Sequence, residues 1–368
     1  MRSRTPKHYT ARPALIGAGL ALAALAQSAA AQEEQPEHTM SPAMAEFSSQ
    51  SHHYHGTGNF MFKYHYMRMT MKDLLDGRKS VTPSQALSSQ YNYAMAPTTM
   101  SMNMHMMEGM YGMSESLAFM AMAQYLSSEM KMVATVSEGL PLEPSLMTAK
   151  GFGDTSLTLM YRANNELMTN FGLSLPSGAI NLAGNMPMNG VSTRTRLPYD
   201  MQLGSGTYDI KPSVTYALRR GPWGFGAQGE YTFRLGLNDY GYKLGNRRDA
   251  QAWASWAMNG NTEFSTRVEL ATWGQIKGAD ANIWQTMPAD SSMPGMDMGH
   301  TAGMSMSPNA DPKNSGGVRL TTFVGMSGKA NNGNFGFSIE AGLPLYQRLT
   351  GLQMRTRSIL GASMSVSF

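Results

Sequence analysis

Methionine and histidine are the side chains of this sequence best placed to do chemistry. The chain has 35 methionines and no cysteine in 368 residues. Thioethers are soft ligands, and together with imidazoles they suit Cu(I) or a similar soft ion. The densest group lies in a stretch rich in Gly, Ser and Pro, where no apolar core explains it: Met293, Met296, Met298, His300, Met304 and Met306. We take this group as the candidate metal site and Cu(I) as its candidate ligand, and the sequence indicates no other cofactor.

Two further methionine rows alternate with other residues in the N-terminal third of the chain. In residues 58 to 70, Phe60, Phe62, Tyr64 and Tyr66 would face lipid, which leaves Met61, Lys63, His65, Met67 and Met69 facing inward. In residues 99 to 112, the row Met100, Met102, Met104 and Met106 is the more apolar one, so we expect it to face lipid. The inward row could line a path for a soft cation or fill a narrow lumen. Exposed methionines could also serve as oxidation targets, and His52, His53 and His55 could bind metal or be solvated.

Catalytic motifs are missing from the sequence. It contains no Gly-x-Ser-x-Gly elbow, no His-Glu-x-x-His, no phosphate loop and no dinucleotide fingerprint. We therefore predict that the protein is not an enzyme and assign no catalytic residues, with a barrel enzyme acting at the rim as the least favoured alternative.

The pattern of the first 31 residues predicts an export signal. Arg2, Arg4, Lys7 and Arg12 precede an apolar run at residues 14 to 26, and three alanines then lead to Gln32. This segment holds four of the 29 Lys and Arg residues and no acid, so removing it leaves 25 against 25 Asp and Glu. A nucleic-acid partner, which would need a basic surface, is therefore not expected.

Alternating segments dominate the rest of the chain and predict β-strands with one apolar and one polar face. In residues 223 to 235, Trp223, Phe225 and Phe233 share one face, whereas Gln228 and Arg234 share the other. A soluble β-sandwich would alternate in the same way. Short turns on one side and long loops on the other favour instead a transmembrane antiparallel barrel of about 12 strands, with 10 to 14 allowed.

The expected strands are residues 58–70, 99–112, 116–127, 152–163, 167–176, 204–218, 223–236, 246–258, 262–275, 316–327, 334–343 and 355–368. The phase of each strand then predicts the charged and polar side chains that line the lumen: Lys63, His65, Asp154, Arg162, Asp209, Lys211, Glu230, Arg234, Arg267, Glu269, Arg319, Glu340, Arg355 and Arg357. Because bases outnumber acids in this set, we expect a weak preference for anions or zwitterions. The same side chains could instead pair across a closed lumen.

Four blocks of sequence resemble a family of Gram-negative outer-membrane proteins, the putative transporters of the phenol-degradation (MetA-type) pathway. The blocks are Gly151-Phe152-Gly153-Asp154, residues 171 to 178 (FGLSLPSG), residues 203 to 209 (LGSGTYD) and residues 340 to 347 (EAGLPLYQ). The resemblance runs through most of residues 56 to 368. It implies a barrel and a passive transport role, without a defined substrate or catalytic residues.

These patterns together predict a signal peptide at residues 1–31, a flexible periplasmic segment at 32–56 and a barrel at 57–368. The expected location is the outer membrane of a Gram-negative-type bacterium after Sec-type export, and the expected function is passive passage of small solutes with a link to copper. The alternative is a copper-binding or metal-tolerance surface protein without an open pore. The expected partners are membrane lipid, the barrel-assembly machinery and a small solute, and the sequence leaves the oligomeric state open.

Overall fold

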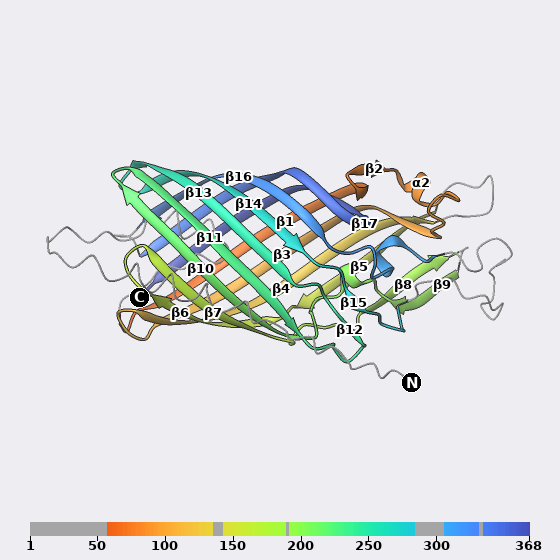
Figure 1. Ribbon diagram of the computed structural model, residues 1–368, viewed down its shortest axis with the longest axis horizontal. Helices are drawn as coiled ribbons and strands as arrows, with labels where there is room; N and C mark the ends of the chain where they lie inside the picture. Colours follow the sequence, from red (N-terminus) through yellow and green to blue (C-terminus); the bar gives the residue numbers. More distant parts are fainter. Residues whose placement is uncertain (1–56, 135–142, 189–190, 284–304, 331–333) are drawn as a thin grey trace, which may run out of the picture. The chain divides into compact units, whose positions relative to one another are not determined.

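A computed structural model describes residues 57–134, 143–188, 191–283, 305–330 and 334–368. The long strands are β1 (Phe60–Gly77), β3 (Met95–Gly112), β4 (Leu117–Ala134), β5 (Glu143–Phe152), β6 (Thr155–Arg162), β7 (Leu167–Leu175), β10 (Tyr208–Arg220), β11 (Trp223–Leu235), β13 (Arg247–Asn259), β14 (Thr262–Trp273), β16 (Gly317–Ala330) and β17 (Phe335–Ser367). In this part of the chain the only helical segments are α2 (Pro83–Ala86), η1 (Tyr199–Met201) and η2 (Pro308–Ala310). The predicted all-β class is confirmed (Figure 1).

The strands form one closed antiparallel ring. Its hydrogen-bonded order is β17, β16, β14, β13, β11, β10, β7, β6, β4, β3 and β1, and β1 pairs again with β17 to close it. Closure leaves the ring without an open edge, so each of its strands has a neighbour on both sides. Short pairs decorate one end of the barrel: β2 (Lys79–Val81) on β1, β8 (Ala183–Met188) with β9 (Val191–Arg196), and β12 (Tyr242–Lys243) with β15 (Lys277–Gly278) (Figure 1).

Strand β17 crosses the barrel twice. Its residues 335–349 pair with β16, whereas its residues 349–367 pair with β1. The two halves contact each other through the Ser338 and Ser363 hydroxyls at 2.7 Å and through Gln347 and Thr356, whose two hydrogen bonds measure 2.8 and 3.0 Å. The chain reverses near Gly351, which has a φ of +72° that favours glycine. The eleven labelled strands of the ring therefore make twelve crossings, in agreement with the predicted strand number.

Several strands are longer than expected at one end. Sequence patterning placed residues 71–98 and 128–151 in loops, but β1 continues to Gly77, β4 continues to Ala134 and β5 begins at Glu143. A strand of 18 residues such as β1 is about 60 Å long, far more than the apolar band of about 25 Å that such barrels present to lipid. The extra length therefore lies outside the membrane layer, where alternation is weaker. Short turns, such as those at residues 113–116 and 163–166, occupy the other end.

Large apolar side chains cover the outer face of the barrel. Phe62, Phe119, Phe171, Tyr216 and Phe264 are all more than a third exposed although each lies within a strand of the ring. Their neighbours in the chain are buried polar residues, for instance Lys63 and Thr215. This inversion, with apolar side chains outside and polar side chains inside, is the arrangement expected of a barrel in lipid. No helix in the described ranges is long and apolar enough to span a membrane.

Candidate functional site

The lumen is the candidate functional site, and it has two chemically different sides. Antiparallel register partners point to the same face of a sheet, so the pairings assign each row of side chains to the inside or the outside. We call the inner faces of β10, β11, β13, β14, β16 and residues 335–349 of β17 the charged side. The inner faces of β1, β3, β4, β5, β6 and β7 form the methionine side. Each side is continuous because its strands are neighbours in the ring.

Arg267 of β14 organises the charged side. Its guanidinium binds both carboxylate oxygens of Glu340, at 3.1 and 2.8 Å, and one oxygen of Glu269 at 2.9 Å. The same group stacks on the Phe323 ring, with 3.8 Å from Cζ to the ring centroid. Arg319 extends the network to Glu269 at 3.8 Å. Arg267 is only 5% exposed, so its charge depends on these acids rather than on water.

A second group on the charged side lies toward the long-loop end. Asp209 is fully buried, forms an ion pair with Arg234 and accepts a hydrogen bond of 2.7 Å from the Thr207 hydroxyl. Lys211 and Glu230 lie in the same inward rows of β10 and β11. Arg162 of β6 belongs to the methionine side, where it lies at the short-turn end and donates to the Glu115 carbonyl at 3.0 Å. The structure therefore places all of these predicted lumen residues on inward rows.

Arg355 and Arg357 are corrections to the predicted lumen set. The pairing of β17 with β1 shifts register between Thr70 and Met71, where Ser358 and Thr356 are the successive partners and Arg357 is skipped. Arg357 is consequently exposed and forms an ion pair with Asp73. Arg355 alternates with buried Thr356 and so leaves the inward row. A β-bulge changes the side-chain parity of everything beyond it, and the predicted phase did not include one. Without these two residues, the basic excess behind the anion preference largely disappears.

The methionine side includes the row on β3 that was predicted to face lipid. Met100 and Met106 are 3% and 5% exposed, and their register partners on β1 are Met71 and His65. That prediction was wrong because Glu108 has the same parity as this row, and its charge belongs inside. On the described strands of this side, the register places the following methionines inward: Met61, Met67, Met69 and Met71 of β1, Met100, Met102, Met104, Met106 and Met110 of β3, Met120, Met122, Met130 and Met132 of β4, Met147, Met160 and Met168.

The polar row of β3 therefore faces outward, and tyrosines of β1 satisfy it. The Tyr66 hydroxyl donates to the Asn103 amide oxygen at 2.8 Å, and the Tyr64 hydroxyl lies 2.7 Å from His105 Nδ1. These bonds remove much of the cost of placing an amide and an imidazole next to lipid. Apolar character alone thus misassigned a strand whose outward polar groups are covered by their neighbours.

Two buried methionine clusters lie at the two ends of this side. The first contains Met61, Met110, Met120, Met160 and Met168, near the short turns. The second contains Met95, Met100, Met130, Met132, Met147, Met201 and Met306, toward the long loops. Between them, Met67, Met69, Met102 and Met104 are only partly buried. Methionine therefore lines the lumen along its length.

His65 and Glu108 lie on the inner face between the clusters. Within the described residues, neither ring nitrogen of His65 has a hydrogen-bond partner, and Oε1 of Glu108 has none either. Both side chains are almost fully buried, at 4% and 2% exposure. Buried polar atoms normally find partners, so this pair is the least satisfied part of the methionine side.

An insertion between β7 and β10, which we call the inserted loop, is described over residues 176–188 and 191–207 and lies where the two sides meet. The second half of β4 pairs with β5, which pairs with no other strand of the described structure, whereas the first half of β4 pairs with β6. Asp154, between β5 and β6, accepts hydrogen bonds from Gly178 N at 2.9 Å, Ser205 N at 2.8 Å and Ser205 Oγ at 2.7 Å. The predicted lumen residue Asp154 therefore anchors both ends of the inserted loop.

The inserted loop and its neighbours cover the methionine side at the long-loop end. Met201 and Leu203 of the loop belong to the second methionine cluster. Tyr199 packs edge-on against Tyr242 of β12, with 4.9 Å between ring centroids, and burial raises the pKa of Tyr242 to about 12. Tyr242 therefore stays neutral over the physiological range. The first five members of the candidate metal group, from Met293 to Met304, lie outside the described residues. Its sixth member, Met306, is buried in the second cluster.

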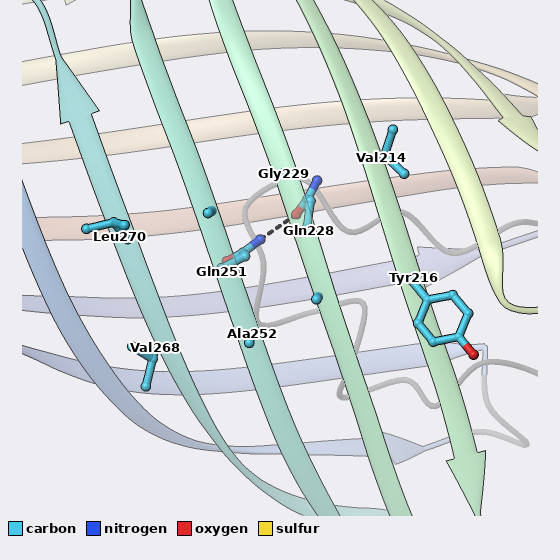
Figure 2. Close-up of a pocket in the computed structure, with 10 residues that line it drawn as sticks. Val214, Tyr216, Gln228, Gly229, Gln251, Ala252, Val268 and Leu270 are labelled. Carbon is cyan, nitrogen blue, oxygen red and sulfur yellow. Dashed lines mark hydrogen bonds between the residues drawn. The ribbon is translucent and has the colours of Figure 1, made fainter. Parts of the chain in front are cut away.

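One depression in the described surface belongs to the outer face rather than to the lumen. It is lined by Val214, Tyr216, Ala227, Gly229, Ala250, Ala252, Val268 and Leu270, among others (Figure 2). Small side chains on β11 and β13 leave it between larger ones on β10 and β14. Gln228 and Gln251 border it from their strands, and their side chains hydrogen-bond to each other. The depression therefore faces lipid and does not mark a place where a solute binds inside.

Comparison with known proteins establishes the fold. The chain matches no family model and no curated protein. Its structure is similar to that of the COG4313 outer membrane channel from Pseudomonas putida F1, with a TM-score of 0.54 and 12% identity over 91% of this chain and 100% of that one. The toluene transporter TodX from Pseudomonas putida is similar at a TM-score of 0.42 and 10% identity, over 84% of this chain and 89% of that chain. The first likeness supports the closed β-barrel fold.

Proposed function

We propose that this protein is a passive channel in the outer membrane of a Gram-negative-type bacterium, and that it is not an enzyme. The observation that carries the proposal is the closed ring with an apolar outer face and a charged inner face. In lipid, every backbone group must be paired within the protein, and a closed barrel achieves this. The similarity to the COG4313 channel supports the fold on which the proposal depends.

The packing of the lumen indicates that the solutes are small. Arg267, Arg319, Asp209 and Gln228 are each less than a tenth exposed although they point inward. The basic and acidic groups of the charged side pair with each other, as Arg267 does with Glu340 and Arg234 with Asp209. We therefore expect weak selectivity between simple anions and cations rather than the anion preference predicted from sequence.

The break in the wall beside β5 offers a second route out of the lumen. At this level β5 pairs with β4 on one edge only, and the inserted loop, held by Asp154, packs against β5 through Met201 and Leu203. A solute with an apolar part could therefore leave sideways when the loop moves. Membership of the phenol-degradation (MetA-type) transporter family would agree with such solutes, and it is part of this proposal.

We also propose that the protein is linked to soft metal ions, above all Cu(I). The support is the methionine content of the lumen, because thioethers prefer soft ions. This differs from the sequence-based hypothesis, which placed the metal on a surface loop. The described residues do not include that loop, so the inward methionines of the described strands are the support for a soft metal ion.

Channel function is tested by reconstituting the purified mature chain in planar bilayers. We expect discrete conductance steps in KCl and a reversal potential near zero in a tenfold KCl gradient, because the inward charges are nearly balanced. Absence of steps from protein that folds in detergent would contradict the open channel. If the mature chain were monodisperse in buffer without detergent, the membrane barrel itself would be refuted. A hydrolase screen with a serine-reactive probe tests the enzyme alternative, and we expect no labelling.

A further inference from the structure

Three ligand types meet at mid-height on the methionine side. His65 of β1 is the register partner of Met106 of β3, and Lys63 is the partner of Glu108. Register partners have their Cβ atoms about 5 Å apart, and residues two positions along a strand are about 7 Å apart. The imidazole, the Met106 thioether and the Glu108 carboxylate are therefore close enough to share one bound ion, and Met104 lies on the diagonal from His65.

Unpartnered atoms distinguish this place from ordinary packing. Within the described residues, Nδ1 and Nε2 of His65 and Oε1 of Glu108 are buried without a hydrogen-bond partner. Methionine filling a lumen explains thioethers but does not explain why a histidine and a glutamate are buried among them with unused ligand atoms. An ion at this place would satisfy both.

The ligand set selects the class of ion. No group of three or more His, Cys, Asp or Glu residues that could hold a metal occurs in the described ranges, so a hard or borderline ion such as Zn²⁺ lacks its usual ligands there. Imidazole with thioethers suits a soft monovalent ion, Cu(I) or Ag(I). The low charge of such an ion also matters, because the Lys63 ammonium lies two positions from His65 on the same face. Glu108 opposes that charge, whereas Glu340, which lies over Gly361 opposite Met67, is already paired with Arg267.

Methionines lead from this place toward both ends of the lumen. Met100, Met102, Met104 and Met106 follow at every second position of β3, which spaces their Cβ atoms by about 7 Å. At the long-loop end, the Met130 sulfur accepts a hydrogen bond of 3.2 Å from the Asn309 amide, which also binds Asp200 at 3.2 Å. Met130 of β4 is thus one inward thioether of this side that accepts a hydrogen bond.

We propose that the methionine side is a path for a soft monovalent cation, with His65, Met106 and Glu108 forming its binding site at mid-height. The transport part rests on the proposed channel function, whereas the binding part does not. The outward methionines of the same barrel, Met107, Met258 and Met364, provide a matched control because they share the chemistry and face lipid.

The binding site is tested with Ag(I) as the probe. The mature protein in detergent is titrated with silver nitrate in chloride-free buffer, and binding is followed by calorimetry. We compare wild type with the variant His65→Leu/Met106→Leu and with the control Met107→Leu/Met364→Leu. The inward variant should lose at least tenfold in the tightest affinity, and the control should match wild type. Equal affinity in all three would overturn the site. X-ray absorption of the wild-type Cu(I) complex gives a readout that needs no variant, and a shell without sulfur would overturn it as well.

The path is tested in planar bilayers under bi-ionic conditions, with silver nitrate on one side and potassium nitrate on the other. The wild type should favour Ag(I) over K⁺, and His65→Leu/Met106→Leu should lower this ratio at least threefold while the K⁺ conductance stays. An equal ratio in the two proteins would overturn the path and leave the channel intact. Absence of K⁺ conductance in wild type would refute the channel instead, and the silver titration would still decide the binding site.

Discussion

The two sides of the lumen are filled by chemically different side chains. The charged side fills space with long side chains fixed by directional ion pairs, such as Arg267 with Glu340 and Glu269. The methionine side fills space with flexible thioethers, of which Met130 accepts a hydrogen bond from Asn309. A rigid wall and an adaptable wall therefore line the same barrel. Removing equal numbers of atoms from the two sides should lower the free energy of unfolding by unequal amounts.

Removing the central cation of the charged side should have the largest effect. Arg267→Leu leaves the largely buried Glu340 carboxylate without its ion-pair partner and leaves Glu269 with Arg319 alone, and breaking a buried pair usually costs about 3 to 5 kcal/mol. The free energy of unfolding, measured by urea titration in detergent, should fall by that amount. The double variant Arg267→Leu/Glu340→Leu should recover part of it, because fewer charges then remain buried. If Arg267→Leu were as stable as wild type, water would have to solvate the two glutamates, and the charged side would not be the more rigid of the two sides.

Weakening the attachment of the inserted loop should have the second-largest effect on stability. Asp154→Ala removes three hydrogen bonds that hold the inserted loop. The net contribution of one hydrogen bond to a charged group is about 1.5 to 3 kcal/mol, and the three contributions are not additive because they share one carboxylate. We expect a net loss of about 2 kcal/mol and faster proteolysis within residues 176–207. Asp249→Ala, on the charged side and remote from this loop, serves as the control. Unchanged cleavage would show that other contacts hold the loop.

A smaller effect tests the corrected phase of β3. Tyr66→Phe removes the donor to Asn103 and leaves a polar group facing lipid, which should lower the free energy of unfolding by about 1 kcal/mol. Tyr161→Phe is the control, because Tyr161 is also exposed on the outer face without a comparable polar partner among the described contacts. If both variants were equally stable, Asn103 would have to point elsewhere.

The smallest effect should come from the adaptable wall itself. Met104→Leu conserves volume and shape closely, and such exchanges usually cost less than about 1.5 kcal/mol. Because Met104 is only partly buried, we expect less than about 0.5 kcal/mol in the same urea titration. A loss comparable to that of Arg267→Leu would mean that the methionine side is as tightly specified as the charged side, and the contrast between the two walls would fail.

The success of sequence reasoning also divides along these two sides. Strands such as residues 223–236 and 262–275 were placed to within a few residues, because charge and aromatic rings alternate there and fix the phase. Residues 99–112 lack that contrast: methionine and small polar residues alternate, and only Glu108 and Tyr111 reveal which row is inside. Inward Trp253 and Phe323 were missed because they are apolar, although each shares the parity of a polar neighbour in its strand.

Features that depend on three-dimensional pairing could not be predicted. The bulge that turns Arg357 outward, the double crossing of β17 and the anchoring of the inserted loop by Asp154 all arise from contacts between distant segments. Asp154 was expected in the lumen because of its parity, but no local pattern connects it to Gly178 and Ser205. The short turns, in contrast, were recognisable because each contains Gly, Asn or Ser between two alternating runs.

The double crossing of β17 has a consequence for biogenesis. Met61 is paired with Ser367, so one edge of β1 stays unpaired until the last residues of the chain have joined the barrel. Joining positions about 300 residues apart costs about 5 kcal/mol of loop-closure entropy. The backbone hydrogen bonds that form together between β1 and β17 offset this cost. A nascent barrel that has lost its final hairpin would expose two sheet edges, and such edges are prone to aggregate. Quality control of this protein can therefore act at a single point, the zipping of its last strand onto its first.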